Sequence, residues 1–359
     1  MNIQEATKSY EAWMRSCTSV VESDLRDKHA QMKDDLFLFF RGTYYRWAQL
    51  WSKKCPELRG APRVLAVGDL HVGSFGTWRD AEGRLCWGVD DFDEAYPLPY
   101  TNDLVRLAAS AKLVIESGVL DLKFKQACNA ILDGYQESLQ SAGCPIVLAE
   151  QETNLERLGV DAFRSPPGFW QKLNSRPTVH NGALPRTARH ALMISLPDRN
   201  LDFKVVRRRA GLGSLGQLRF VAIGKLHGGF IAREAKAVVP SASLWMKGKV
   251  SRAQSYYERA VRSSIRSGDP YQRVVGTWVI RRLSPDSNPI DIEELPKKRD
   301  EETLLKSMGS EAANVHLGSE PRGTKILKDL RSRKSDWLKA AAKDMAQAIE
   351  EDWREYKKS

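Results

Sequence analysis

Acidic residues follow two predicted strands in the first third of the chain, and their types and spacing suit phosphate and metal chemistry. Asp69 comes just after the apolar run VLAV (64–67), and Ser74 follows five positions later. The second group, DDFDE (90–94), comes directly after the apolar segment RLCWGV (84–89). A carboxylate just past a buried strand projects into a cleft, where it can accept a hydroxyl proton. Carboxylates are also the hard oxygen ligands that Mg²⁺ prefers.

The spacing from Asp69 to Ser74 matches kinase catalytic loops, in which an Asp precedes a metal-holding side chain by five positions. Asp91, followed by Phe92, is similar to the metal-binding Asp of the kinase Asp-Phe-Gly segment, and Asp93 offers a further carboxylate. The two acids are 91 − 69 = 22 residues apart, with one predicted hairpin between them that could bring both to one end of a small sheet. We therefore expect Asp69 to be catalytic, and Asp91, Asp93 and Ser74 to hold metal.

Each acidic segment has a simpler explanation when it is taken alone. DFDE is most often a solvated acidic turn. GDLH (68–71) also fits a metallophosphoesterase, in which an Asp-x-His supplies metal ligands. That class needs further Gly-Asp and Gly-Asn-His segments downstream, and the sequence has none.

A glycine-rich segment, GLGSLG (211–216), has the GxGxxG pattern. A Rossmann loop requires a helix straight after the glycines, whereas LRFVAI (218–223) is rich in β-branched and aromatic residues and predicts a strand. A glycine loop between antiparallel strands lets the backbone approach phosphates closely. We expect Gly211, Gly213, Ser214 and Gly216 to contact the phosphates of a nucleotide, and the alternative is an ordinary glycine hairpin.

The next predicted strand, FIAREAK (230–236), carries two basic residues that could grip those phosphates. Lys236 and Arg233 are three positions apart, so in a regular strand they face opposite sides and only one faces the cleft. We choose Lys236 because kinases use a lysine at this place, and Arg233 stays the alternative. Glu258, in a following helix, is a candidate partner for the lysine.

The elements around these motifs indicate an α+β fold. Helical periodicity runs through 8–51, 101–118, 121–139, 301–317 and 335–356, and strand patterns occupy 203–223 and 277–283. Residues 160–200 are rich in Pro, Asn, Ser and Arg, as in a linker. The expected organisation is an N-terminal helical segment (1–60), a catalytic-loop and metal-loop part (61–160), a linker (161–200), a glycine-loop β lobe (201–285) and C-terminal helices (286–359).

Composition limits the classes of protein that the chain can represent. Its 359 residues are 42% hydrophobic, and no apolar run reaches the ~18 residues of a membrane helix. With no signal-like N-terminus, we expect a cytoplasmic protein. The cysteines form no CxxC pair, so neither a zinc site nor a disulfide framework is indicated. The net charge of +11 suits anionic partners, but it is spread along the chain without an aromatic-interleaved basic stripe.

Taken together, the motifs resemble an uncharacterised bacterial family, domain of unknown function 2252, which is grouped with kinase-like folds. GDLH also looks like the catalytic loop of aminoglycoside and choline phosphotransferases. The matching stretches span most of the chain: FFRGTYYRW (39–47), VGDLHVGSFG (67–76), DDFDEAYPLPYTNDLVRLAAS (90–110), RRRAGLGSLG (207–216), AREAKA (232–237), VIRRLSP (279–285) and MGSEAANVH (308–316).

The resemblance implies a protein-kinase-like two-lobed fold, with a small antiparallel β lobe and a helical lobe. It implies Asp69 as catalytic residue, Asp91 as metal ligand, and Asp103 as the acid that braces the catalytic loop. Two features depart from the family pattern. Ser74 stands where Asn is usual, and the glycine loop follows the catalytic Asp instead of preceding it. A circular permutation would explain the order, with helix 301–317 corresponding to the one that normally precedes the catalytic loop.

These observations predict an ATP- and Mg²⁺-dependent phosphotransferase that acts on an unknown hydroxyl-bearing acceptor. One alternative is a non-catalytic, nucleotide-binding pseudokinase or sensor. A second, suggested only by the charge, is a nucleic-acid-binding protein.

Overall fold

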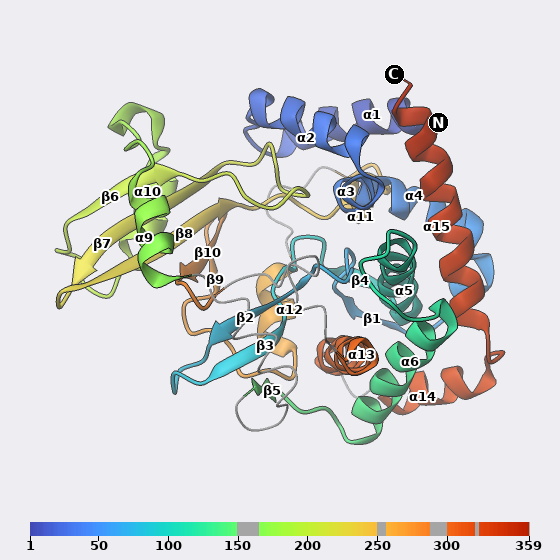
Figure 1. Ribbon diagram of the computed structural model, residues 1–359. Coiled ribbons are helices and arrows are strands. Elements are labelled where there is room, and N and C mark those ends of the chain that lie inside the picture. Colours follow the sequence, from blue (N-terminus) through green and yellow to red (C-terminus); the bar gives the residue numbers. More distant parts are fainter. Residues whose placement is uncertain (149–164, 250–255, 288–299, 320–322, 359) are drawn as a thin grey trace.

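The computed structural model describes residues 1–148, 165–249, 256–287, 300–319 and 323–358. It is a mixed α+β fold with antiparallel sheets, so the expected fold class is confirmed at that level. Figure 1 shows the largest sheet on one side of the molecule and most of the helices on the other, with two smaller sheets near the middle.

The largest sheet is antiparallel and has five strands in the order β6-β7-β8-β10-β9. The first two strands form the predicted strand–glycine turn–strand hairpin, with Val205 opposite Ala222. The next pairing sets Ala222 opposite Arg233. The strands are β6 (Phe203–Arg207), β7 (Arg219–Leu226), β8 (Gly229–Ala237), β9 (Arg273–Val275) and β10 (Trp278–Leu283).

Two helices cover the faces of this sheet in the segment that we expected to be a linker. Residues 161–164 of that segment lie outside the described residues. The rest contains α9 (Pro166–Asn174), which packs through Leu173 on Val206, and α10 (Arg186–Met193), whose Leu192 packs in a cluster with Val205. The expectation of an irregular linker is therefore wrong for these residues. Prolines at the first turn begin a helix instead of breaking one, and both helices are too short to show a strong period.

The N-terminal region forms four helices where the periodicity suggested one. They are α1 (Ile3–Cys17), α2 (Glu22–Asp34), α3 (Leu36–Gly42) and α4 (Tyr44–Lys54). The helical structure is interrupted after α1, where Val20 pairs with Gln217 beside the glycine loop. It is interrupted again at Asp35, whose carboxylate accepts a hydrogen bond of 2.6 Å from the backbone N–H of Leu38 and so caps the start of a new helix.

Four short strands hold the two acidic segments. β1 (Arg63–Ala66) pairs with β4 (Tyr96–Pro99), and β2 (Phe75–Arg79) forms a hairpin with β3 (Leu85–Val89). The strands predicted at 64–67 and 84–89 are confirmed to within one residue. The carbonyl of Ser74 accepts a hydrogen bond of 3.0 Å from the N–H of Asp90, so both acidic loops leave the hairpin at one end. The two-residue strand β5 (Ile146–Val147) extends this sheet.

Two of the remaining helices, over residues 100–116 and 301–317, pack on β1. Helix α13 (Glu301–Leu317) has the predicted bounds. A helix was expected over 101–118, and α5 (Tyr100–Glu116) begins one residue earlier, with Pro99 at the N-cap. The other helices are α6 (Phe124–Gln140), α11 (Ala242–Trp245), α12 (Tyr257–Ser263), α14 (Gly323–Ser332), α15 (Trp337–Tyr356), and the 3-10 turns Pro56–Leu58 and Asn181–Ala183.

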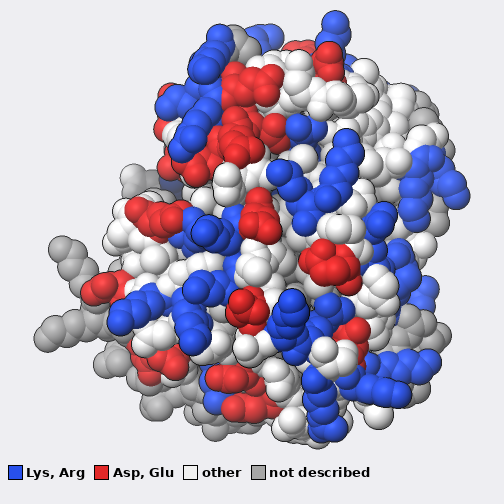
Figure 2. All heavy atoms as spheres, turned by 90° about the vertical axis from the view of Figure 1, so that its right-hand side faces the viewer, with Lys and Arg blue, Asp and Glu red and all other residues white. Residues whose placement is uncertain are grey.

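Surface charge is mixed on the face next to α15. Figure 2 shows basic and acidic side chains interspersed there, without one continuous basic stripe. Among the described residues, no helix combines the length and the apolar character that crossing a membrane requires.

Candidate functional site

A cavity of about 180 Å³ lies between the glycine loop, the two acidic loops and the N-terminal helices. Its lining includes Asp69, Asp91 and Asp93 from the first third of the chain, and Gly211, Gly213 and Ser214 from the second half. One cavity thus brings together acidic and glycine-rich segments that lie far apart in the sequence. Gly216 lies at the base of the loop, where its carbonyl accepts a hydrogen bond of 2.8 Å from the N–H of Val21.

Backbone geometry fixes the start of the catalytic loop. Gly68 has φ of +83°, and a Cβ on it would lie 2.4 Å from the carbonyl oxygen of Glu94, so only glycine fits. The Asp103 carboxylate accepts hydrogen bonds from the N–H groups of Val67 and Gly68, at 2.7 and 3.0 Å. It also contacts His316 Nε2 of α13, at 3.0 Å, and accepts from Asn102 Nδ2 at 3.3 Å. The expected bracing of this loop by Asp103 is thus confirmed.

A buried arginine holds Asp69. Arg106 of α5 is fully buried, and its Nε donates a hydrogen bond of 2.6 Å to Asp69 Oδ1. The guanidinium also donates to the carbonyl of Phe40 and lies 4.0 Å from the centre of the Phe40 ring. Burial raises the pKa of the Asp69 carboxyl, and Arg106 opposes that shift. The carboxylate is therefore oriented by a fixed cation at the edge of the cavity.

Ser74 closes the same loop. Its hydroxyl donates to the carbonyl of Asp69 and accepts from the N–H of His71, each at 3.0 Å. Ser74 lines the cavity, but these two contacts use its proton and one lone pair inside the loop. A metal at this residue would have to share the hydroxyl with the loop contacts.

The second acidic loop meets Lys236. Its Nζ lies 2.5 Å from Asp93 Oδ2 and 3.6 Å from Asp91 Oδ1. Burial favours a higher pKa for Asp91, but Lys236 and Arg281 outweigh it and hold the pKa below its usual value. Burial and the Asp91 carboxylate raise the pKa of Asp93. Lys236 thus brings a cation to two carboxylates that differ in their readiness to ionise.

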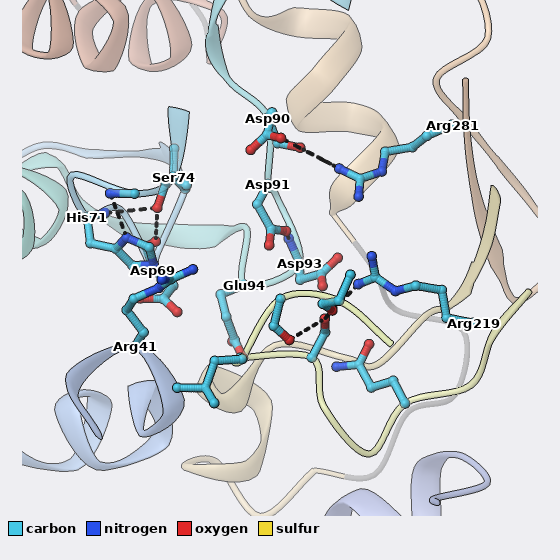
Figure 3. A pocket seen from close by; sticks show the side chains of 18 of the residues that line it. Arg41, Asp69, His71, Ser74, Asp90, Asp91, Asp93, Glu94, Arg219 and Arg281 are labelled. Carbon is cyan, nitrogen blue, oxygen red and sulfur yellow. Dashed lines mark hydrogen bonds and ion pairs between the residues drawn. The ribbon is translucent and has the colours of Figure 1, made fainter. Parts of the chain in front are cut away.

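The neighbouring acids Asp90 and Glu94 are only partly exposed to water. Burial raises the pKa of Asp90 to about 6, although Arg281 opposes the shift. Burial also raises the pKa of Glu94 to about 8, although the N–H of Ala242 donates to its carboxylate at 2.7 Å. Figure 3 shows Asp90, Asp91 and Asp93 along the loop between Asp69 on one side and Arg219 and Arg281 on the other.

The two basic candidates on β8 point to different places, as strand alternation requires. Arg233 donates from Nε to the carbonyl of Ser195 at 3.1 Å, and its guanidinium lies 3.8 Å from the centre of the Tyr271 ring. Lys236 is directed to the acidic loop. Glu258, the partner considered for Lys236, instead pairs with Arg262 at 2.6 Å.

Glu234, two residues before Lys236, was not identified from the sequence. Its buried carboxylate binds Arg208 at 2.6 Å, and Arg219 and Arg281 at 3.2 Å each. Burial would raise the pKa of Glu234, but the three arginines hold it well below its usual range. Alternation along the strand places positions 234 and 236 on one face, and that signal could have revealed the residue.

Contacts with Arg219 and α2 hold the glycine loop. Arg219 donates from Nη2 to the hydroxyl of Ser214 at 2.6 Å. Lys28 of α2 donates to the carbonyl of Gly213 at 3.1 Å. Asp24 on the same helix forms an ion pair with Arg209 at 3.1 Å and another with Arg207. The loop is therefore a fixed wall of the cavity.

Arg106 and the basic residues of α2 and α3 were also missed. Helix α5 is buried over almost its whole length, so an arginine within it had to have a special partner. That signal was readable in NDLVRLAAS (102–110). Lys28 and Arg41 carried no local signal, because α2 and α3 reach the cavity only through tertiary packing.

The acidic residues of the cavity could bind Mg²⁺ together with the phosphates of a nucleotide, but not by themselves. Among the described residues, no group of three or more His, Cys, Asp or Glu side chains forms a ready metal cluster. Mg²⁺ commonly binds one or two carboxylates together with substrate phosphates and water. Asp91 and Asp93 meet that requirement, since both line the cavity that the glycine loop covers.

Comparison with known proteins adds one match. No curated protein and no solved structure matches the chain. The sequence profile of the family described as "Uncharacterized protein conserved in bacteria (DUF2252)" matches residues 3–166, which include both acidic loops and Asp103, and this supports the family resemblance seen in the sequence.

Proposed function

We propose that the protein is an ATP- and Mg²⁺-dependent phosphotransferase that acts on a hydroxyl-bearing acceptor. The observation that carries this proposal is the shared cavity. Carboxylates of Asp69, Asp91 and Asp93 face a glycine loop that the sequence separates from them by well over one hundred residues. Phosphoryl transfer depends mainly on positioning and on neutralising charge, and this set of groups can supply both.

The glycine loop would cover the phosphates of the nucleotide. Gly211 and Gly213 carry no side chain that would keep the phosphates from the backbone, and Ser214 is held by Arg219. Lys236 would exchange its contact with Asp93 for phosphate oxygens. Asp91 and Asp93 would hold Mg²⁺, which supplies further neutralisation of phosphate charge when it is bound.

Asp69 would orient the acceptor hydroxyl and take its proton. Arg106 favours the ionised form of the carboxylate and fixes its direction. The brace from Asp103 to Val67 and Gly68 keeps the loop in place. Positioning of this kind accounts for a large part of catalysis when two reactants are brought together.

A permuted kinase-like fold of two lobes is part of the proposal. The five-stranded sheet with its glycine hairpin corresponds to the β lobe, and the helices around β1 to the helical lobe. One contact supports the permutation: the N–H of Leu65, in β1, donates a hydrogen bond of 2.6 Å to the hydroxyl of Ser319, just after α13. The end of α13 therefore lies beside the strand that leads into the catalytic loop, as expected for the helix that normally precedes it.

The substitution Asp69→Ala tests whether Asp69 is needed for phosphoryl transfer but not for binding of ATP. Binding of ATP with Mg²⁺ should raise the melting temperature of the wild type and of the variant to a similar extent. Release of ADP, with or without an acceptor mixture, should fall by about a hundredfold or more in the variant. Unchanged ADP release would refute the role of Asp69. The control is Asp198→Ala, an exposed aspartate that does not line the cavity.

A nucleotide sensor without catalysis is the second candidate. It is favoured by Ser74, whose hydroxyl is already engaged in the catalytic loop, at the position where kinases usually have Asn. Binding of ATP by the wild type without any ADP release or transfer would support the sensor. ADP release that Asp69→Ala abolishes would exclude it.

A further inference from the structure

We propose that the acceptor carries an anionic group, a carboxylate or a phosphate, which Lys28 and Arg41 bind beside Asp69. The inference rests on the proposed phosphotransferase function and names the class of its acceptor: a hydroxyl compound with an acidic substituent. Both residues line the cavity together with Asp69. They come from the N-terminal helices, not from the sheet that carries Lys236.

Arg41 lies at the end of α3, next to the catalytic loop. A Cβ on Gly73 would lie 3.8 Å from Arg41 Cζ, and Figure 3 shows the guanidinium group beside Asp69 and His71. Its Nε is buried and has no hydrogen-bond partner. In the part of the chain that the structure describes, the Arg41 side chain forms no ion pair, and its one packing contact of note is with the Phe37 ring at 5.7 Å.

Lys28 of α2 is the second cation on the side of the cavity that α2 and α3 form, called here the α2–α3 wall. Its side chain is 8% exposed, and its Nζ donates to the carbonyl of Gly213 at 3.1 Å. An ammonium group has three donors, and among the described residues this carbonyl is the acceptor it contacts. A buried cation without a carboxylate partner is unfavourable. An anion that enters the cavity would supply the missing partner.

Most of the other basic groups of the cavity differ because they contact carboxylates. Arg208, Arg219 and Arg281 converge on Glu234. Arg282 pairs with Asp269 at 3.7 Å. Arg266 has no ion pair among the described residues, but it donates to the carbonyl of Val89 at 3.0 Å and lies 4.1 Å from the centre of the Trp78 ring. Asp69 attracts Arg41 electrostatically, but no ion pair joins them among the described residues, and Asp69 Oδ1 is already bound to Arg106 at 2.6 Å. The positive charge that remains open to a ligand therefore includes the α2–α3 wall.

The position of Arg41 assigns the charge of this wall to the acceptor, and Lys28 joins the wall to the glycine loop through the carbonyl of Gly213. In the proposed mechanism the nucleotide phosphates lie between the glycine loop and Lys236. Arg41 lies on the other side of Asp69, away from Arg219 and Arg281 in Figure 3. A hydroxyl compound that places its oxygen at Asp69 would bring an acidic substituent within reach of Arg41 and Lys28.

The test uses the full-length protein saturated with Mg²⁺ and AMPPNP, an analogue that fills the γ-phosphate position and is not transferred. Inorganic phosphate and malonate are then titrated separately, and their apparent Kd is measured from the further rise in melting temperature. We expect at least one of the two anions to bind. Lys28→Gln and Arg41→Gln should each weaken it by about tenfold or more, as for the loss of a charge-assisted hydrogen bond.

Two controls keep the outcomes distinct. Arg26→Gln removes an exposed charge from the same helix and should leave anion binding unchanged. Lys28→Arg keeps the charge and should retain most of the affinity for the anion. Melting temperatures without ligand show whether each variant is folded, and Arg41→Gln serves if Lys28→Gln does not fold.

Three results would overturn the proposal. They are a wild-type complex that binds neither anion, anion binding that survives both substitutions, and substitutions that weaken AMPPNP more than the anion. The last result would assign the two cations to the nucleotide. If AMPPNP does not bind the wild type at all, the proposed function itself fails, and the acceptor site fails with it.

Discussion

Lys236 Nζ of β8 lies 2.5 Å from Asp93 Oδ2, although the two residues are 143 positions apart. The contact joins the sheet that carries the glycine loop to the loop that follows β3. Lys236 is only 2% exposed, so the ion pair is largely protected from solvent screening. The two halves of the proposed phosphate site are therefore already linked without a nucleotide.

Lys236→Met should destabilise the protein by about 2–4 kcal/mol, because it leaves the Asp93 carboxylate without its partner. Asp93→Asn alone should also destabilise it. The double variant should be more stable than the sum of the single effects predicts, with a coupling of about 1 kcal/mol or more. Urea unfolding of the four proteins measures the coupling directly.

The same variants test the nucleotide role of Lys236. Lys236→Met should weaken binding of Mg²⁺–ATP by about tenfold or more, since a charge-assisted contact to phosphate is lost. Arg233→Met, on the opposite face of β8, is the matched control and should leave nucleotide affinity unchanged. A larger loss of affinity in Arg233→Met than in Lys236→Met would reverse the assignment.

The elements that carry the motifs could be predicted because local patterns specify them. Apolar runs marked β1 and β3, and β-branched residues after the glycines marked β7, so the hairpin was predicted. The pairing of β1 with β4 could not be predicted, because partners that are not joined by a hairpin are chosen by tertiary packing. Helices α9 and α10 were not predicted for a different reason. Each buries only a few side chains on the sheet, so the sequence shows no clear helical periodicity there.

The site shows the same division between local and non-local information. The spacing from Asp69 to Asp91 suggested that a hairpin brings both acids to one end of a small sheet, and the β2–β3 hairpin lies between them. Strand alternation could have placed Glu234 on the face of Lys236, but its partners Arg208 and Arg281 could not be predicted, because they are scattered in the sequence and meet only in the folded sheet. Charge runs such as Arg281–Arg282 are usually solvated, and sequence reading alone has no means of seeing a buried carboxylate opposite them.

Arg106→Met should destabilise the protein by about 3 kcal/mol, since it removes one partner of a largely buried ion pair. The expected loss is at the lower end for such pairs, because the Asp69 side chain is 21% exposed. Removal of Arg106 takes away the main opposition to the effect of burial and leaves only that of Arg41, so the pKa of Asp69 should rise further. The acid limb of the pH–rate profile for ADP release should therefore move to higher pH. A loss of stability without this displacement would show that Arg106 has only a structural role.

Glu311 of α13 should make the stability depend on pH. Its carboxylate is 1% exposed and accepts a hydrogen bond of 3.2 Å from the N–H of Val89. Burial raises its pKa from the ordinary value of 4.5 to about 6, although Arg266 and Asn314 oppose the shift. Between these two values the folded state binds more protons than the unfolded state, so the contribution of Glu311 to stability falls as pH rises.

Glu311→Gln, which stays neutral, should remove this part of the pH dependence. The difference in unfolding free energy between wild type and variant should change by about 2 kcal/mol across the window, at ~1.4 kcal/mol for each pKa unit. Urea titrations at intervals from pH 4 to pH 7 give this difference. Glu302→Gln removes an exposed charge from the same helix and serves as the control. A flat difference curve for Glu311→Gln would contradict the assignment.

The contact between α6 and α13 predicts a strong effect of a single methyl group. A Cβ on Gly309 would lie 2.1 Å from the carbonyl oxygen of Ile131, and one on Gly134 would lie 1.8 Å from that of Lys306. Backbone cannot yield as a flexible side chain can, so Gly309→Ala should destabilise the protein by about 3 kcal/mol or more. Gly60→Ala, where an added Cβ meets nothing within 4 Å, is the matched control.

Because α13 also carries His316, which contacts Asp103 at 3.0 Å, Gly309→Ala should also loosen the contact by which Asp103 holds the catalytic loop. Amide hydrogen exchange at Val67 and Gly68 measures that loosening, and we expect faster exchange there in Gly309→Ala than in the control.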